Sequence, residues 1–141
     1  MKNQIEYRFV KNEIAQFALF DKNIVADIKE VQFQTETQFF YDKENRVLCC
    51  KISITMLQQE KVLLKVELDS FFELTAESVM QLQQDNRIVF DPMLLIQFAS
   101  LCYGTLRGVL HVKTLGTVLN AFVLPPIYFQ NIINKPFVVE F

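Results

Sequence analysis

The side chains most able to do chemistry in this sequence are one histidine and one cysteine on the same predicted helix. His111 is the only histidine, and Cys102 precedes it by nine residues. Successive residues of a helix are turned by about 100°, so nine steps place the two side chains on opposite faces. They cannot act as nucleophile and base within one chain. We therefore interpret His111 as a surface or satisfied histidine rather than a catalytic one.

Sequence patterns of common enzyme and metal sites are absent. The sequence has no Gly-x-Ser-x-Gly, no Gly-rich phosphate loop and no His-Glu-x-x-His, and its three glycines leave little room for a backbone phosphate cradle. Cys49, Cys50 and Cys102 are an odd number without Cys-x-x-Cys spacing, which indicates neither a disulfide framework nor a zinc site. We expect no enzymatic activity, no metal and no cofactor.

Apolar residues are abundant for a chain of this size. They make up 51% of the 141 residues, and 14 of them are phenylalanine. By length the chain is one domain, residues 1–141, which buries roughly two thirds of its unfolded surface. The excess of apolar side chains predicts that some are hidden by association of several copies or used for binding. The net charge of -2 provides no basic field for nucleic acid.

Two segments bear on the question of a membrane. Residues 1–10 alternate charged and apolar side chains and contain no signal-peptide core, so we expect a cytoplasmic protein. Residues 114–134 carry no charged side chain, but Gly116, Pro125 and Pro126 interrupt them. Proline donates no backbone hydrogen bond and disfavours helix at the residue before it. We therefore expect an extended apolar segment here, and no membrane insertion.

Alternating apolar and polar residues predict a sheet in the first half of the chain. Residues 47–57 and 61–74 alternate on either side of a polar turn and predict an antiparallel hairpin. Residues 31–41 predict a strand that precedes this hairpin in a meander. Residues 5–20 predict a fourth, broken strand, because Tyr7 and Phe9 are out of phase with Ile14. A bulge or crossover is expected after Asn12.

Two helices are expected in the second half. Thr75 is a cap for a short helix from Ala76 to about Gln84, and Asp91 followed by Pro92 begins a long helix that ends near Lys113. The long helix is apolar over most of its circumference and must be buried on more than one side. We therefore predict an α+β fold, in which a four-stranded antiparallel sheet is packed by one long helix, with a short C-terminal helix or turn beyond the prolines.

One stripe of the long helix carries small or polar side chains at steps of three and four residues: Gln97, Ser100, Gly104, Gly108 and His111. Glycine inside a helix costs up to about 1 kcal/mol, so two glycines one turn apart require a reason. The stripe either faces solvent or packs closely against another backbone, such as the same helix of a second subunit.

The C-terminal part of the sequence resembles the SecB family of export chaperones. The matching positions, in order, are Leu106, Arg107 and Gly108; Gly116 and Thr117; Leu119 and Asn120; and Leu124, Pro125, Pro126, Tyr128 and Phe129. The resemblance implies a SecB-like, α+β chaperone that binds non-native polypeptides without ATP. It also implies a homotetramer, a dimer of dimers, associated through the long helices at Ser100, Gly104, Gly108 and His111.

Apolar residues on both sides of the predicted crossover are the candidate client-binding residues. They are Phe17, Leu19, Phe20, Phe122, Leu124 and Tyr128. These side chains either belong to the core or line a groove that accepts unfolded apolar segments by area rather than by sequence. Each side chain that a client buries contributes about 1.5–3 kcal/mol, so several grooves on an oligomer would act by avidity.

The resemblance also implies a docking site for the export motor SecA, on the outer face of the sheet. The corresponding residues here are Leu63, Glu67 and Asp69, with Lys65 at a position where the family has an acid. The alternative for these charges is a solvated strand face. Two other functions stay open: a SecB-like chaperone dedicated to one partner, such as an antitoxin, and a small-molecule module with lipid between sheet and helix.

Overall fold

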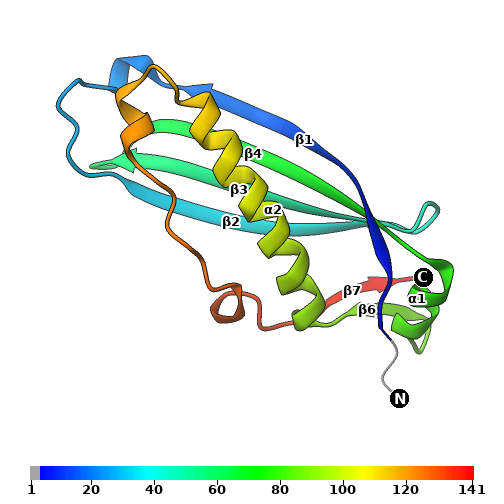
Figure 1. The fold of residues 1–141 in the computed structure, drawn as a ribbon. Coiled ribbons are helices and arrows are strands. Elements are labelled where there is room, and N and C mark those ends of the chain that lie inside the picture. The colour runs from blue at the N-terminus through cyan, green and yellow to red at the C-terminus, as the bar shows by residue number, and fades with distance from the viewer. Residues whose placement is uncertain (1–3) are drawn as a thin grey trace.

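The computed structural model describes residues 4–141 and consists of a sheet with one long helix across it (Figure 1). Residues 1–3 lie outside the described residues. They are the first part of the segment 1–10, for which we expect no signal-peptide core. The strands are β1 (Tyr7–Leu19), β2 (Gln32–Asp42), β3 (Val47–Gln58) and β4 (Lys61–Leu74), and the helix is α2 (Pro92–Lys113). The predicted α+β architecture is therefore confirmed.

The four long strands form an antiparallel sheet in the order β1-β4-β3-β2. β2, β3 and β4 make the predicted meander, whereas β1 crosses over to pair with the far side of β4. A single 3-10 turn, η1 (Asp21–Asn23), begins that crossover. The β3-β4 hairpin turns through Gln59 and Glu60, both at positive φ, which is the two-residue geometry that matches the twist of the strands.

The break predicted in β1 exists as two bulges. Pairing with β4 skips Val10 and Ala15, one on each side of Asn12. Each skipped residue reverses the phase of the alternation, which explains why the apolar residues at the two ends of β1 are out of step in the sequence.

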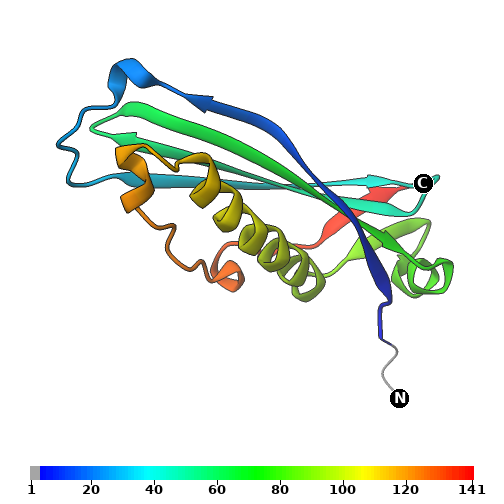
Figure 2. The same ribbon diagram turned by 45° about the horizontal axis from the view of Figure 1, so that its top comes forward.

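A second, smaller sheet lies at one end of the first (Figure 2). The short helix α1 (Ala76–Leu82) is capped by Thr75 as predicted, but it ends two residues before Gln84 because Gln83–Gln84 form strand β5. β5 pairs with β6 (Arg87–Phe90), which also pairs with β7 (Phe137–Glu140). The C-terminal residues 137–140 therefore form a strand.

The long helix α2 has the predicted bounds. The side chain of Asp91 accepts a hydrogen bond from the backbone N–H of Leu94 (2.9 Å) and caps the helix. α2 is long and apolar enough to cross a membrane by length and composition alone, a test that core helices also meet. Its packing explains its composition, because it buries these side chains: Leu94, Leu95, Phe98, Ala99, Cys102, Tyr103, Leu106 and Leu110.

Beyond α2 the chain is mostly extended. It contains two 3-10 turns, η2 (Val118–Ala121) and η3 (Phe129–Asn131), on either side of the two prolines. Of the short C-terminal helix or turn predicted beyond the prolines, the structure has the turn, η3. In both ribbon views this segment runs along the β2 side of α2 (Figures 1 and 2).

The core is the interface between α2 and the central strands. Phe98 of α2 packs against Phe72 of β4 with ring centroids 4.6 Å apart, and against Tyr7 of β1 edge to face at 4.7 Å. The inward residues of β3 are fully buried: Leu48, Cys50, Ile52, Ile54 and Met56. The alternation of the hairpin therefore predicted its buried face.

We expect Phe98→Ala to destabilise the protein by about 3–5 kcal/mol, because it removes a fully buried ring and leaves a cavity beside Phe72 and Tyr7. Urea denaturation followed by circular dichroism measures the loss at fixed protein concentration. Met93→Ala on the same helix is the matched control, because Met93 is exposed and should change stability by less than about 0.5 kcal/mol. Equal losses in the two variants would contradict this description of the core.

Candidate functional site

An exposed apolar surface lies between β1 and α2, and we call it the β1-α2 surface. It consists of Phe9, Ile14, Leu101 and Val112, of which Phe9 is 52% and Leu101 49% exposed. Phe9 and Leu101 line a pocket of about 240 Å³ whose polar floor is the hydrogen bond from Ser70 Oγ to Asn12 Oδ1 (2.5 Å). Such side chains are mostly buried in folded domains, so this surface is suited to a partner.

The four residues predicted for an oligomer interface lie together on the exposed side of α2, next to the β1-α2 surface. Ser100, Gly104, Gly108 and His111 are all exposed. A Cβ atom added at Gly104 or Gly108 would meet no atom within 4 Å. Nothing within the described chain therefore requires glycine at these two positions of a helix.

A second exposed apolar surface follows the segment after α2, and we call it the C-terminal surface. It consists of Val118, Val123, Tyr128 and Ile132, with Val123 72% and Tyr128 64% exposed. Buried residues alternate with these along the segment and hold it on the core: Leu119, Leu124, Phe129 and Ile133.

Contacts with α2 fix the course of this segment. The hydroxyl of Tyr103 donates a hydrogen bond to the carbonyl oxygen of Pro125 (2.5 Å), and its ring packs edge to face on Phe129. The two prolines donate no backbone hydrogen bonds, so this contact supplies a specific anchor where the chain has no regular secondary structure. The exposed side chains of the C-terminal surface are thus held on an ordered backbone.

The candidate client-binding residues do not form one groove. Phe17, Leu19 and Phe20 lie at the end of β1 that leads to η1, whereas Tyr128 precedes η3, at the opposite end of the C-terminal segment in both ribbon views (Figures 1 and 2). Phe20 and Tyr128 are exposed, and Phe17 and Leu19 are half-buried. Lys113 Nζ lies 5.3 Å from the ring centroid of Phe17, a cation–π contact between β1 and the C-terminal end of α2.

The space between α2 and the C-terminal segment is nearly closed. Phe122 and Leu124 line a crevice of only about 40 Å³ together with His111. Phe122 is half-buried and Leu124 is buried, so these two side chains serve mainly as packing. Val123, which lies between them in the sequence, is the exposed one. Only the in-and-out alternation of an extended chain could have indicated Val123 as the residue available to a partner.

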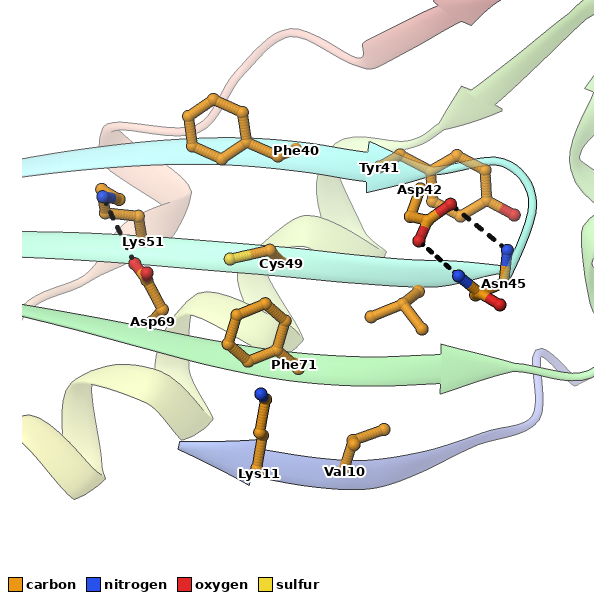
Figure 3. A pocket seen from close by; sticks show the side chains of 11 residues that line it. Val10, Lys11, Phe40, Tyr41, Asp42, Asn45, Cys49, Lys51, Asp69 and Phe71 are labelled. Atoms are coloured by element: carbon orange, nitrogen blue, oxygen red, sulfur yellow. Dashed lines mark hydrogen bonds and ion pairs between the residues drawn. The ribbon is translucent and has the colours of Figure 1, made fainter. Parts of the chain in front are cut away.

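The outer face of the sheet, opposite α2, carries an open pocket of about 590 Å³ (Figure 3). Phe40, Cys49, Phe71 and Lys11 occupy paired positions on β2, β3, β4 and β1 and form one row across it. Burial, together with the nearby Asp69, raises the pKa of the Cys49 thiol to about 12, so the thiol is protonated at neutral pH. The thiol therefore adds no charge to the pocket, which combines aromatic side chains with the charged groups of Lys11, Lys51 and Asp69.

The residues expected to dock a partner on this face differ in their environments. Glu67 and Asp69 are partly exposed and flank Lys51, whose Nζ lies 3.7 Å from Glu67 Oε2 and 3.6 Å from Asp69 Oδ1. Leu63 was expected on the outer face, but it is fully buried. Pairing of β3 with β4 skips Leu63, so Leu63 and Leu64 are both buried. The side chain of Leu63 is therefore not available to a partner in this structure.

Other types of site find little support in the described part of the chain. Within residues 4–141, no group of three or more His, Cys, Asp or Glu side chains is arranged to hold a metal ion. Two pockets of the described chain adjoin both β1 and α2. One, of about 240 Å³, is below the range of about 300–1,000 Å³ typical of small-molecule sites. The other, of about 920 Å³, is an open surface pocket with polar side chains in its lining: Gln4, Glu6, Asp91 and Gln97.

Comparison with known proteins identifies the fold. No family model and no curated protein sequence matches this chain. Among solved structures, it is similar to a SecB-like chaperone of Mycobacterium tuberculosis determined in complex with a ChAD peptide from an antitoxin. The TM-score is 0.50 at 14% sequence identity, over 88% of this chain and 90% of that one. At this identity the likeness shows the fold alone, and that fold is SecB-like.

Proposed function

We propose that this protein is a holdase chaperone that binds unfolded polypeptides without ATP and keeps them from aggregating. The observation that supports this most is that two ordered apolar surfaces remain exposed beside a complete core. Val123 and Tyr128 on one surface, and Phe9 and Leu101 on the other, are each about half exposed or more. The SecB-like fold is consistent with the same function.

Binding would consist of the reversible burial of client side chains on these surfaces. Burial of one large apolar side chain contributes about 1.5–3 kcal/mol, so a single surface gives weak and quickly reversible binding. Several subunits in one particle would raise the effective concentration of further surfaces for the same client. We therefore propose a cytoplasmic homotetramer, a dimer of dimers, in which the stripe with Gly104 and Gly108 packs against a second copy.

A chaperone dedicated to one partner is a second candidate, and two observations favour it over protein export. The docking leucine that the family resemblance implied, Leu63, is buried, and Lys65 replaces an expected acid. The structurally similar SecB-like chaperone was determined with an antitoxin peptide. SecA is therefore the less favoured partner. Lipid binding has little support, because the 240 Å³ pocket is small and the 920 Å³ pocket has polar side chains in its lining.

Replacing Val123 and Tyr128 together by serine should weaken protection of an unfolded client. Both side chains are exposed, so the fold should persist. Each side chain that the client buries contributes about 1.5 kcal/mol or more to the binding free energy, and this contribution is lost in the variant. Light scattering during dilution of a denatured client measures the protection. We expect at least tenfold more variant to be needed for the same protection.

Met80→Ser is the matched control, because Met80 is 68% exposed but lies on α1, away from both apolar surfaces. It should protect the client as well as the natural sequence does. A natural sequence that fails to slow aggregation at one tetramer per client would refute the proposed function.

Leucine at both Gly104 and Gly108 should break the oligomer, because a larger side chain separates backbones that pack closely. Alanine at Gly108 has space in the single chain and should raise the stability of an isolated subunit by up to about 1 kcal/mol. Light scattering coupled to size-exclusion chromatography measures the particle mass. A monomeric natural protein, or an unchanged mass for the double leucine variant, would exclude this stripe as the interface.

Affinity capture from cells that express the tagged protein at its natural level should separate the two candidate functions. A general holdase is expected to carry many precursors or other non-native chains in low amounts. A dedicated chaperone is expected to carry one small protein at a stoichiometric level. Binding of purified SecA with a Kd tighter than about 10 µM would instead support the export route.

A further inference from the structure

The two edges of the four-stranded sheet are built differently. β1 forms one edge and contains two bulges, and its outward side chains include Arg8, Lys11 and Glu13. Bulges and charged residues are the usual means by which proteins prevent an edge strand from pairing with another chain. β2 forms the other edge and pairs with β3 through eleven consecutive positions, Gln32 to Asp42, without a register shift.

β2 has little of this protection, because it has no bulge and its only charged residues are Glu36 and Asp42. The sequence QFQTETQFFYD has no proline, lysine or arginine, and its half-buried and exposed residues alternate without interruption. Among residues 4–141, the backbone of β2 forms no hydrogen bond outside its pairing with β3 and adjoining turns. One side of a long, regular strand is therefore left with unpaired N–H and C=O groups.

The open part of this edge is its first two thirds. At the far end, the ring of Phe39 lies 6.3 Å from that of Phe137 on β7, and Lys43 Nζ donates to the carbonyl oxygen of Glu140 (2.8 Å). Both ribbon views place β7 beside this end of β2 (Figures 1 and 2). Residues 32–38 of β2 therefore form the open part of the edge, which is about 23 Å long at 3.3 Å per residue.

We propose that an extended segment of the client pairs with residues 32–38 of β2 as a fifth strand of the sheet. This inference rests on the proposed function and names a second mode of contact for the same client. Pairing of this kind uses main-chain hydrogen bonds, which every sequence except proline can supply. It therefore suits a protein whose clients differ in sequence.

The side chains of β2 define which segments bind best. On the outer face Glu36 lies between Gln34 and Gln38, and within residues 4–141 it forms no ion pair. A lysine or arginine of the added strand would pair with Glu36, whereas an acidic residue would be repelled. On the inner face Phe33, Thr35 and Thr37 are half-buried and continue toward the apolar C-terminal segment. The preferred client segment alternates basic and apolar residues.

A second copy of this chain fits the edge less well. In an antiparallel pair of two β2 strands centred on Thr35, Glu36 of each copy faces Gln34 of the other. The two glutamates are then diagonal neighbours, about 7–8 Å apart on the same face, with no cation on either strand to separate them. The charge of the edge therefore favours a basic client over a β2-β2 dimer.

A synthetic nine-residue peptide of alternating lysine and valine tests the proposal on the full-length protein. Hydrogen exchange should show new protection at residues 32–38 when the peptide is bound. The same peptide with glutamate in place of lysine should bind at least fivefold more weakly. N-methylation of five consecutive central residues, which removes the donors on both edges of the peptide, should weaken binding at least tenfold.

Two charge reversals complete the test. Glu36→Lys should weaken binding of the lysine peptide about fivefold to tenfold and strengthen binding of the glutamate peptide. Glu13→Lys, at another exposed glutamate on the opposite edge, should change the affinity for neither peptide by more than about twofold.

The following results would overturn the proposal. If a denatured client is still protected from aggregation but β2 gains no protection and Glu36→Lys behaves as Glu13→Lys does, the pairing is wrong and the chaperone function stands. If neither peptide nor client binds, both the strand pairing and the chaperone function are wrong. If residues 32–38 are protected without peptide, increasingly so with protein concentration, the edge is occupied by a second copy.

Discussion

The packing of a single helix on a four-stranded sheet is the constraint on which the rest of this structure depends. Strands lie about 4.8 Å apart and a helix with its side chains is about 10–12 Å across, so one helix covers roughly two strands. Phe98, Cys102 and Leu106 of α2 are fully buried, in contact with the central strands β3 and β4. The inner faces of the two edge strands therefore need another cover.

The two edge strands are covered differently, and this determines where apolar surface remains. The segment after α2 extends along the β2 side and buries Leu124 and Phe129 there. Within residues 4–141 no comparable segment covers the inner face of β1, so Phe9 and Ile14 stay exposed. The exposed apolar side chains thus follow from the geometry of the fold as well as from the high apolar content of the sequence.

Local signals predicted the elements of this fold well, and long-range placement poorly. The caps at Thr75 and Asp91 and the alternation of β3 depend on neighbouring residues, which a sequence displays directly. The burial of Leu63 depends on a skipped pairing between β3 and β4, which alternation alone does not reveal. The separation of Phe20 from Tyr128 depends on the path of an extended segment, for which the two prolines specify local conformation but not direction.

The two edges of the sheet offer different kinds of contact that do not compete for the same residues. The β1-α2 surface has exposed apolar side chains beside the glycine stripe, and it borders a bulged edge with charged residues. The β2 edge has regular unpaired backbone and only acidic charge. Association of copies through the first would leave the second free. A particle with several such edges could then hold one client by main-chain pairing and apolar burial together, and the avidity of repeated weak contacts would compensate for the small gain from each.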